Sequence, residues 1–365
     1  MNSVGMQVDI DAAGNVRGFC PGTDASAGSI LIGSHLDSVP NAGAYDGVLG
    51  VVLGISLVEG LAERRLPFSI EVIGFSDEEG VRFGVPFIGS RAVIGDLDRE
   101  TLQIRDRTSM PLERVIRDFG LDPARLRDAV VSSSARAYLE FHIEQGPVLE
   151  SIGVPLGVVE AILGQSRASL TFIGRANHAG TTPMQLRQDA LCAAAEWITH
   201  VENAANSTQG LVATVGKLEA KPGASNVVPG EVTASLDVRH AVDSVRTRVI
   251  EELLQAAHEI GRRRGLQVES RVVVDQRAVS MDRELTHICE RALERAGVRP
   301  HRMTSGAGHD AMIVARRLPA AMIFLRSPGG ISHHPDETVH EEDITLALRA
   351  GIHLLEELST CPLHT

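Results

Sequence analysis

The first half of the chain alternates between short apolar runs and longer helical patterns. Residues 29–34 (SILIGS) form a short apolar run followed by a polar segment rich in turn residues, which predicts a buried strand. Residues 47–65 are apolar nearly all round until a charged end, which predicts a core helix. Further elements follow in the same style, namely strands at 69–75 and 138–143 and connecting helices at 110–119 and 123–130. This βαβ order is typical of a largely parallel sheet with helices on both faces.

The middle of the chain has a different order of elements. They run β-α-β-β-α-β, with strands at 169–174, 211–218, 232–239 and 266–274 and helices at 189–206 and 245–264. That order is typical of the split βαβ pattern, which can stand as a unit of its own. The alternation of helix and strand then resumes, with a helix at 283–296, a strand at 320–325 and a helix at 342–358. We therefore predict an α/β protein whose larger domain comprises 1–164 and 279–365, interrupted by a smaller α+β domain at 165–278.

Four polar clusters stand at the ends of predicted strands or in glycine-rich loops. They lie at 33–38 with 44–47, at 77–80, at 141–146 and at 330–337. In open parallel sheets, polar sites gather at the carboxyl ends of the strands. Imidazole and carboxylate groups dominate the clusters, and these are the ligands that Zn²⁺, Mn²⁺, Co²⁺ or Ni²⁺ take in sites without sulfur.

The clusters contain enough donors for two metal ions. Two adjacent ions need a bridging carboxylate and about two further ligands each. The clusters supply that number, with Asp46 as the bridge and His35, Glu79, His142 and His333 as the other ligands. Asp37, two residues after His35, can place a carboxylate on the far ring nitrogen of that histidine. His334 has the same chemistry as its neighbour His333, so spacing alone leaves either as the ligand.

Each cluster also has an ordinary structural interpretation when it is taken alone. A histidine at a strand end, such as His35, is commonly a hydrogen-bonded core residue. The pair Glu78 and Glu79 would commonly be solvated charge on a loop. Here the pair directly follows a buried apolar strand, where two carboxylates are costly unless a cation neutralises them. The four clusters together favour a metal site.

Composition and charge narrow the class of protein. The 365 residues include 47 acidic and 35 basic side chains, and the formal net charge of −12 argues against nucleic acid or an anionic membrane as a partner. Hydrophobic residues make up 43%, yet no run of about 18 apolar residues occurs, so no membrane span is predicted. Four widely spaced cysteines and an N-terminus unlike a secretory signal predict a cytoplasmic protein without disulfides.

Five segments carry this chemistry in order along the chain. They are 33–47 (GSHLDSVPNAGAYDG), 75–83 (FSDEEGVRF), 142–146 (HIEQG), 176–184 (ANHAGTTPM) and 330–335 (GISHHP). Together they resemble the amidase, hydantoinase and carbamoylase branch of the M20 metallopeptidase superfamily, which includes N-carbamoyl-L-amino-acid hydrolase, allantoate amidohydrolase and β-ureidopropionase. The resemblance runs from about Val8 to the C-terminal helix. It implies a di-zinc-peptidase-like catalytic domain and an inserted lid that also forms a homodimer.

The resemblance implies roles for residues of the larger domain. Two divalent ions would be bridged by Asp46 and held further by His35, Glu79, His142 and His333. Glu78 would be the general base, and Asp37 would be the partner of His35. Gln145 and Gly308 would contact the substrate.

In the inserted domain, the resemblance implies that His178 reaches the active site of the other subunit and polarises the scissile carbonyl. Asn226 and Arg239 would be a substrate-binding pair, because a guanidinium grips a carboxylate with two hydrogen bonds. Three features depart from the family pattern. The chain begins almost at the first strand, Ala42 stands where glycine is common, and His334 stands where asparagine is common.

The reaction implied by the resemblance is hydrolysis of the ureido C–N bond of an N-carbamoyl-L-amino acid, which releases the amino acid, carbon dioxide and ammonia. Allantoate is the alternative substrate of the same branch. A dipeptidase or N-acyl deacylase is the nearest rival, and a binding protein without catalysis is a rival from another class. The presence of Glu78 and of every ligand favours an enzyme, and GSHLDSVP with ANHAGTTPM favours the carbamoylase branch.

Overall fold

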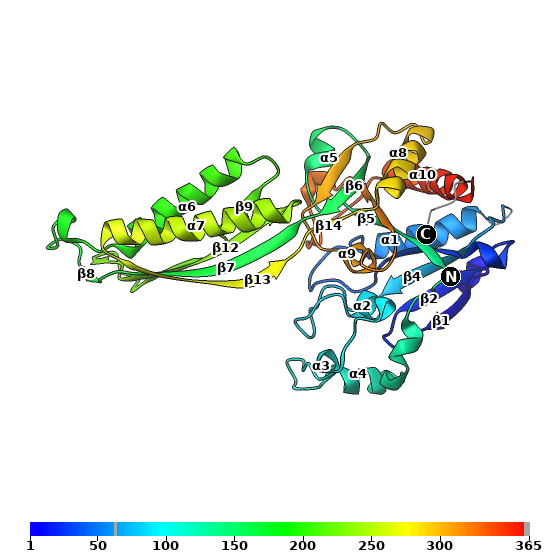
Figure 1. Ribbon diagram of the computed structural model, residues 1–365, viewed down its shortest axis with the longest axis horizontal. Helices are drawn as coiled ribbons and strands as arrows, with labels where there is room; N and C mark the ends of the chain where they lie inside the picture. The colour runs from blue at the N-terminus through cyan, green and yellow to red at the C-terminus, as the bar shows by residue number, and fades with distance from the viewer. Residues whose placement is uncertain (62–63, 361–365) are drawn as a thin grey trace. The chain divides into compact units, whose positions relative to one another are not determined.

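The computed structural model describes residues 1–61 and 64–360, and the chain divides into two compact units. The first unit is Met1–Ile162 with Ser280–Thr365, and the second is Leu163–Val279 (Figure 1). Residues 62–63 of the helix predicted at 47–65 lie outside the described residues, as does Cys361. The other three cysteines are free thiols. No helix in the described ranges is long and apolar enough to cross a bilayer.

A nine-stranded mixed sheet forms the centre of the first unit, in the order β1-β2-β4-β3-β5-β16-β6-β14 with β15 beside β6. The strands are β1 (Gln7–Ile10), β2 (Val16–Cys20), β3 (Ser29–His35), β4 (Ser69–Phe75), β5 (Ala135–Ile143), β6 (Leu156–Ile162), β14 (Val279–Ser280), β15 (Arg302–Ser305) and β16 (Ala320–Leu325). The four neighbours β4, β3, β5 and β16 are parallel and largely buried, which explains why apolar residues predominate in them. The predicted α/β class with a mainly parallel central sheet is confirmed.

Strands β1, β2, β6, β14 and β15 are additional to the predicted ones. β1 lies at an edge of the sheet, and all four of its residues are exposed. Its residues do alternate polar and apolar (QVDI), but four residues are the shortest run over which that period indicates a strand.

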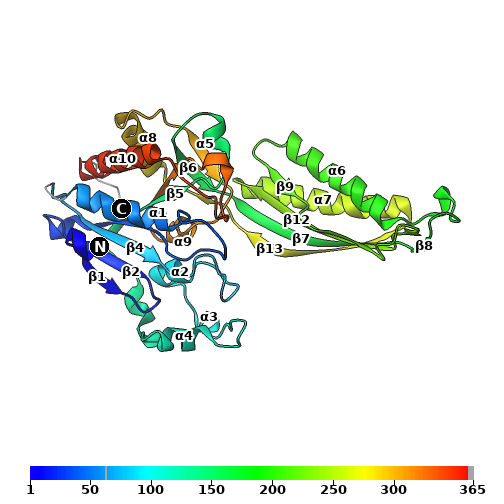
Figure 2. The same cartoon turned by 180° about the vertical axis from the view of Figure 1, so that it is seen from behind.

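Helices cover both faces of this sheet (Figure 2). On one face α1 (Val48–Gly60), α8 (Arg283–Arg295) and α10 (Glu341–Thr360) pack together, and on the other α2 (Ile88–Ile94) packs with α9 (Asp310–Val314). The connections contain the short helices α3 (Arg99–Leu102), α4 (Leu112–Asp118) and α5 (Val148–Ser151). They also contain the 3₁₀ helices η1 (Asn2–Val4), η2 (Ala25–Ala27), η3 (Pro123–Ala129) and η5 (Pro328–Gly330). Pro111 is the N-cap of α4, so the helix predicted at 110–119 begins at Leu112.

Two glycines allow the start of α1 to lie against the ends of two strands. Gly47 has a φ of +72°, and a side chain there would come within 2.3 Å of Nδ1 of His35. A side chain at Gly50 would come within 2.1 Å of the carbonyl oxygen of Phe141. Because such contacts are impossible, any larger residue would displace the helix from β3 and β5.

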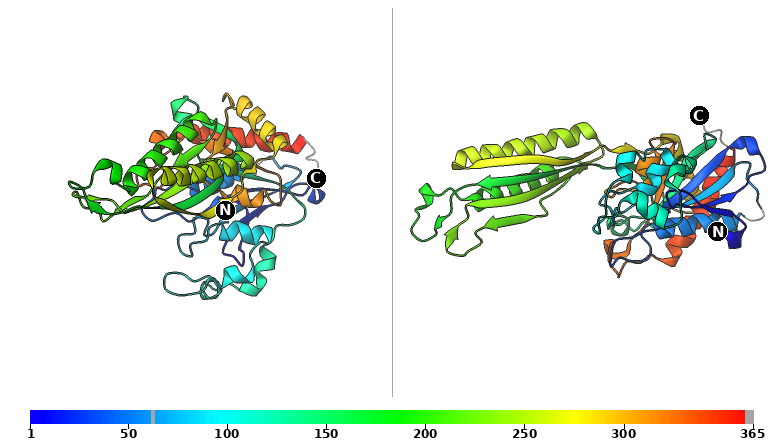
Figure 3. Two further views of the ribbon diagram at one scale, coloured as in Figure 1. Left: turned by 60° about the vertical axis from the view of Figure 1, so that its left-hand side comes forward. Right: turned by 90° about the horizontal axis from the view of Figure 1, so that it is seen from below.

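The second unit is an antiparallel sheet in the order β10-β12-β7-β13, with β9 also on β12. Its strands are β7 (Gly164–Ile173), β9 (Val212–Thr214), β10 (Leu218–Lys221), β12 (Glu231–His240) and β13 (Gln267–Gln276). Helices α6 (Ala190–Ser207) and α7 (Asp243–Arg264) pack on the same face of the sheet (Figure 3). β12 alternates buried and partly exposed residues along its length, as a sheet covered on one face requires.

Two details of the second unit differ from the expected elements. The strand predicted at 211–218 is divided into β9 and β10. A separate two-stranded ribbon pairs β8 (Asn177–His178) with β11 (Val227–Val228), and the 3₁₀ helix η4 (Met184–Leu186) follows β8. These strands are too short for periodicity to indicate them.

Candidate active site

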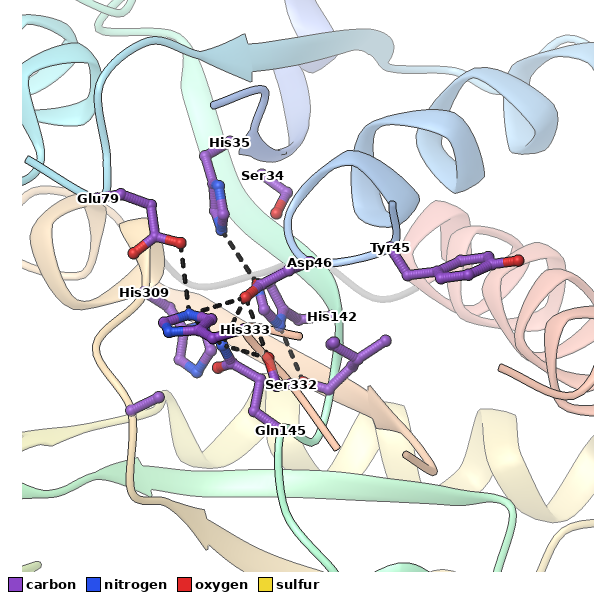
Figure 4. A network of polar contacts seen from close by, with 12 residues as sticks. Ser34, His35, Tyr45, Asp46, Glu79, His142, Gln145, His309, Ser332 and His333 are labelled. Atoms are coloured by element: carbon purple, nitrogen blue, oxygen red, sulfur yellow. Dashed lines mark hydrogen bonds and ion pairs between the residues drawn. The ribbon is translucent and has the colours of Figure 1, made fainter. Parts of the chain in front are cut away.

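Acidic and histidine side chains meet at the carboxyl ends of three parallel strands (Figure 4). His35 is the last residue of β3, His142 lies at the end of β5, and Glu78 and Glu79 lie in the loop after β4. Two loops complete the cluster, one before α1 and one after η5. The ligand atoms fall into sets that lie within 4.8 Å of one another, and these sets contain all five predicted metal ligands, His35, Asp46, Glu79, His142 and His333.

Asp46 lies at the middle of the cluster, and its two carboxylate oxygens face different partners. Oδ1 is 3.2 Å from Nε2 of His142 and 3.6 Å from Nε2 of His35. Oδ2 is 3.0 Å from Nε2 of His333, and that nitrogen is 3.4 Å from Oε1 of Glu79. One carboxylate therefore connects a pair of histidines with a histidine–glutamate pair, as a bridging ligand between two cations must.

The donor atoms of the cluster fit divalent cations. Nδ1 of His35 and Nδ1 of His142 each contact a backbone carbonyl at 2.8 Å, so a neutral ring presents a bare Nε2 to the centre. The two Nε2 atoms are 3.3 Å apart. Within the described residues, Oδ1 of Asp46 and Oε1 of Glu79 are buried without a hydrogen-bond partner. Buried lone pairs that face one another are costly unless a cation lies between them.

The pKa values of the cluster also favour a bound cation. Burial raises the pKa of Glu78 well above its usual value, and the carboxylates of Asp310 and Glu79 add to the rise although His35 opposes it. Burial also raises the pKa of Glu79. Burial lowers the pKa of His35, but the nearby Asp46 carboxylate and the charge of Glu78 outweigh it and raise that pKa well above its usual value. Negative charge is concentrated here, and a cation would relieve it.

Asp37 contacts His35 through a different atom from the one expected. Its backbone carbonyl, and not its carboxylate, lies 2.8 Å from Nδ1 of His35, because the chain turns directly after β3. The carboxylate oxygens instead accept the backbone N–H groups of Glu78 and Glu79, at 3.0 and 3.1 Å. Asp37 therefore orients the loop that carries both glutamates as well as the imidazole.

Gln145 also lies in the cluster, with its Nε2 donating to Oδ2 of Asp46 at 2.8 Å. Of the two adjacent histidines, His333 faces Asp46, whereas Nδ1 of His334 accepts the N–H of Asp336 at 3.2 Å. Gly308 is exposed in the loop after β15, and a side chain there would come within 2.9 Å of the Phe87 ring.

Next to His142 lies a buried polar group that the sequence analysis does not single out. The ring of His309 packs edge-on against that of His142, with centroids 4.4 Å apart, and burial lowers the pKa of His309 well below its usual value. Glu140 accepts the hydroxyl of Tyr138 at 3.0 Å and the N–H of Ala311 at 2.8 Å. Residues 138, 140 and 142 alternate onto one face of β5, so their spacing was an available signal.

In the second unit, the predicted residues lie at two separate places. His178 and Asn226 are close neighbours, because the ribbon pairs His178 with Val227. Arg239 is the next-to-last residue of the ten-residue strand β12, whereas Asn226 comes before that strand begins. The guanidinium of Arg239 donates to both carboxylate oxygens of Asp237, at 2.9 and 3.0 Å. Asn226 and Arg239, predicted to bind substrate, therefore lie toward opposite ends of β12 within one chain.

Comparison with known proteins identifies the family of this chain. Residues 31–357 match the model of Peptidase family M20/M25/M40. The chain belongs to the M20 family. The M20 resemblance of the five sequence segments is thereby confirmed.

Relatives of this M20 chain match it over nearly its whole length. The N-carbamoyl-L-amino acid amidohydrolase of Geobacillus stearothermophilus is 39% identical over 362 residues, covering 98% of this chain and 88% of the relative. Allantoate deiminase 2 of Glycine max is 37% identical over 393 residues, covering 98% and 81%. The crystal structure of an amidase of the hydantoinase/carbamoylase family from Burkholderia multivorans is similar with a TM-score of 0.93 at 30% identity, covering 99% and 88%.

Proposed function

We propose that this M20 chain is a binuclear metal-dependent amidohydrolase that cleaves the ureido C–N bond of an N-carbamoyl-L-amino acid. The products are the amino acid, carbon dioxide and ammonia. The observation that carries the proposal is the Asp46 carboxylate, whose oxygens face two separate sets of buried donors, with Glu78 in the same cluster. The similarity to a relative named for that activity supports the choice of substrate.

The proposed ligands of two divalent cations are His35, Asp46, Glu79, His142 and His333, which suit Zn²⁺, Mn²⁺, Co²⁺ or Ni²⁺. Cations held there would supply a water of lowered pKa and polarise the scissile carbonyl. Glu78 would take the proton from the attacking water and deliver it to the leaving nitrogen. Burial raises the pKa of Glu78, and a carboxylate with a raised pKa accepts a proton more readily than an exposed one.

His178 is proposed to polarise the carbonyl of a substrate bound to the other subunit of a homodimer. Its Nδ1 accepts the N–H groups of Gly180 and Thr181, at 3.0 and 3.2 Å, so the neutral ring carries its proton on Nε2. The residue is exposed, which leaves that N–H available as a donor. A donor of this kind is what a developing oxyanion requires.

Replacing His178 with alanine is expected to lower kcat about 10²-fold or more, the scale of losing one donor to an oxyanion. The measurement is steady-state ammonia release at saturating substrate. His258→Ala is the control, because His258 is also an exposed histidine of the second unit and contacts Ser270 instead. A wild-type kcat in the His178 variant would contradict the proposal that His178 polarises the substrate carbonyl.

The homodimer itself can be tested by co-expressing the His178→Ala chain with a Glu78→Gln chain. If His178 serves the partner's active site, a mixed dimer contains one complete site, and activity exceeds that of either variant alone. Absence of such restoration in isolated mixed dimers would contradict the cross-subunit role. We also propose a cytoplasmic location, with which the three free thiols among the described residues are consistent.

Substrate binding is proposed for Gln145, Gly308, Asn226 and Arg239. The guanidinium of Arg239 already holds one carboxylate, that of Asp237, with two hydrogen bonds. A substrate carboxylate would engage the same kind of planar fork.

Allantoate is the second candidate substrate, because a relative named as an allantoate deiminase is nearly as similar as the carbamoylase. Ammonia release from N-carbamoyl-L-methionine and from allantoate, each at matched concentration, separates the two. We expect a higher kcat/KM for the N-carbamoyl amino acid. A higher kcat/KM for allantoate would make allantoate the preferred substrate. Cleavage of a dipeptide or N-acyl amino acid alone would contradict both candidates.

A further inference from the structure

Glu337 joins two loops that lie far apart in the sequence. Its Oε1 accepts the backbone N–H groups of Tyr45 and Asp46, both at 3.0 Å, across separations of 292 and 291 residues. Its Oε2 accepts the hydroxyl of Ser332 at 3.1 Å. Glu337 is only 5% exposed, so this is a buried carboxylate whose oxygens are directed at the two loops.

The same two loops carry the bridging carboxylate and one terminal ligand of the proposed metal centre. Asp46 receives support at its backbone from Glu337, and its Oδ2 lies 3.0 Å from Nε2 of His333. The hydroxyl of Ser332 is a second link, because it lies 3.2 Å from Oδ2 of Asp46 as well as near Glu337. His333 itself has a φ of +56°, a conformation that a non-glycine residue holds only when its surroundings fix it.

The contact between the loops is also close. A side chain at Gly43 would come within 2.3 Å of Cβ of Glu337, so the first loop passes directly over this glutamate. A change in the position of Glu337 would therefore move the loop that ends at Asp46.

We propose that Glu337 is a positioning residue for the metal centre. It holds the Asp46 loop and the His333 loop in the relative positions that let the Asp46 carboxylate contact both ion sites. The inference rests on the proposed binuclear centre and adds a residue that acts through the ligands. Two amides and a hydroxyl occupy its carboxylate, so its role is separate from that of the ligands.

Replacing Glu337 with alanine leaves the N–H groups of Tyr45 and Asp46 without their acceptor. We expect the affinity for Mn²⁺ to fall about 10- to 100-fold, the usual scale for losing an outer contact to a metal site. Glu337→Gln retains an oxygen for the two amides, and its NH₂ group can donate to the Ser332 hydroxyl, so its affinity should stay close to wild type. Glu337→Asp keeps the charge but is too short to reach both loops, and it should behave like the alanine variant.

Asp106 offers a matched control within the first unit. Its carboxylate accepts the N–H groups of Thr108 and Met110, at 2.9 and 3.0 Å, and the Thr108 hydroxyl at 2.6 Å. Oδ2 of Asp106 also accepts Nε of Arg82 at 3.0 Å. The set again contains two amides and a hydroxyl, with a guanidinium in addition, and none of its members is a proposed ligand. Asp106→Ala should lower the thermal unfolding midpoint while leaving metal affinity at the wild-type value.

The experiment is calorimetric titration of the chelator-treated full-length protein with MnCl₂, together with kcat and KM of the loaded enzyme. Weak binding by the alanine and aspartate variants, with binding restored in the glutamine variant, supports the proposal. Wild-type affinity in Glu337→Asp would overturn it even if Glu337→Ala fails to fold. Equal weakening in Asp106→Ala would also overturn it, because the loss would then reflect general destabilisation. Failure of the wild type to bind metal would remove the proposed function as well, and is a separate outcome.

Discussion

Replacing Glu78 with glutamine is expected to abolish measurable turnover while leaving the metal content of the protein at the wild-type value. Glu78 is 6% exposed and lies in one cluster with His35 and Glu79, but the two oxygens of Asp46 face other residues. Glutamine has the same shape and can neither accept nor deliver the proton of the reaction. The loss in kcat should reach about 10⁴-fold, the upper range for a general base.

Glu79→Gln is the matched control, because it makes the same chemical change at the adjacent residue. Oε1 of Glu79 is 3.4 Å from Nε2 of His333, so this variant should lose metal as well as activity. Metal analysis and ammonia release on both variants separate a base from a ligand. Turnover of Glu78→Gln close to wild type would show that Glu78 is not the base, and loss of its metal would place it among the ligands.

The central sheet and the convergence of its polar residues could be predicted from the sequence. Strands β3 and β16 are buried at every residue, and their apolar runs at 30–32 and 320–325 are easy to recognise. His35 and Glu78 directly follow or end such runs, and the carboxyl ends of parallel strands meet at one edge. The five motifs then placed the chain in the M20 family, which the family match confirms.

The contacts between loops could not be predicted in the same way. The 291-residue separation between Glu337 and Asp46 carries no periodic signal, and nothing in the local sequence indicates which acid will cap which amide. Asp37 illustrates the same limit at short range, since its spacing from His35 was correct for contact but did not reveal which oxygen would make it. Hydrogen bonds of loops depend on the path of the backbone, which residue types alone leave open.

The substrate residues predicted in the second unit lie at two separate places. Arg239 is near the end of β12, and Asn226 comes before that strand begins. The partner that Arg239 does have, Asp237, is two residues earlier in the same strand and shares its face. That i, i+2 relation was visible in the sequence and indicates an ion pair as directly as a substrate site.

Removing metal with a chelator is expected to reduce turnover to background, and adding Zn²⁺, Mn²⁺, Co²⁺ or Ni²⁺ is expected to restore it. At saturation we expect two ions per chain, because the oxygens of Asp46 face two separate donor sets. Binding should also raise the unfolding midpoint, since a ligand at 100 times its Kd stabilises the folded state by about 2.7 kcal/mol. Elemental analysis, activity and thermal unfolding on the same preparation check all three.

Variants of Asp46 and Glu79 distinguish a bridged pair of ions from a single one. Asp46→Ala removes a donor from both sides of the cluster, so both ions should be lost. Glu79→Gln weakens only the side that contains His333, and the side formed by His35 and His142 should retain an ion with the help of Oδ1 of Asp46. Two results would contradict a bridging Asp46. One is a wild type that saturates at one ion, and the other is an Asp46→Ala variant that keeps one ion at wild-type affinity. Loss of a bridging carboxylate must weaken binding at both positions.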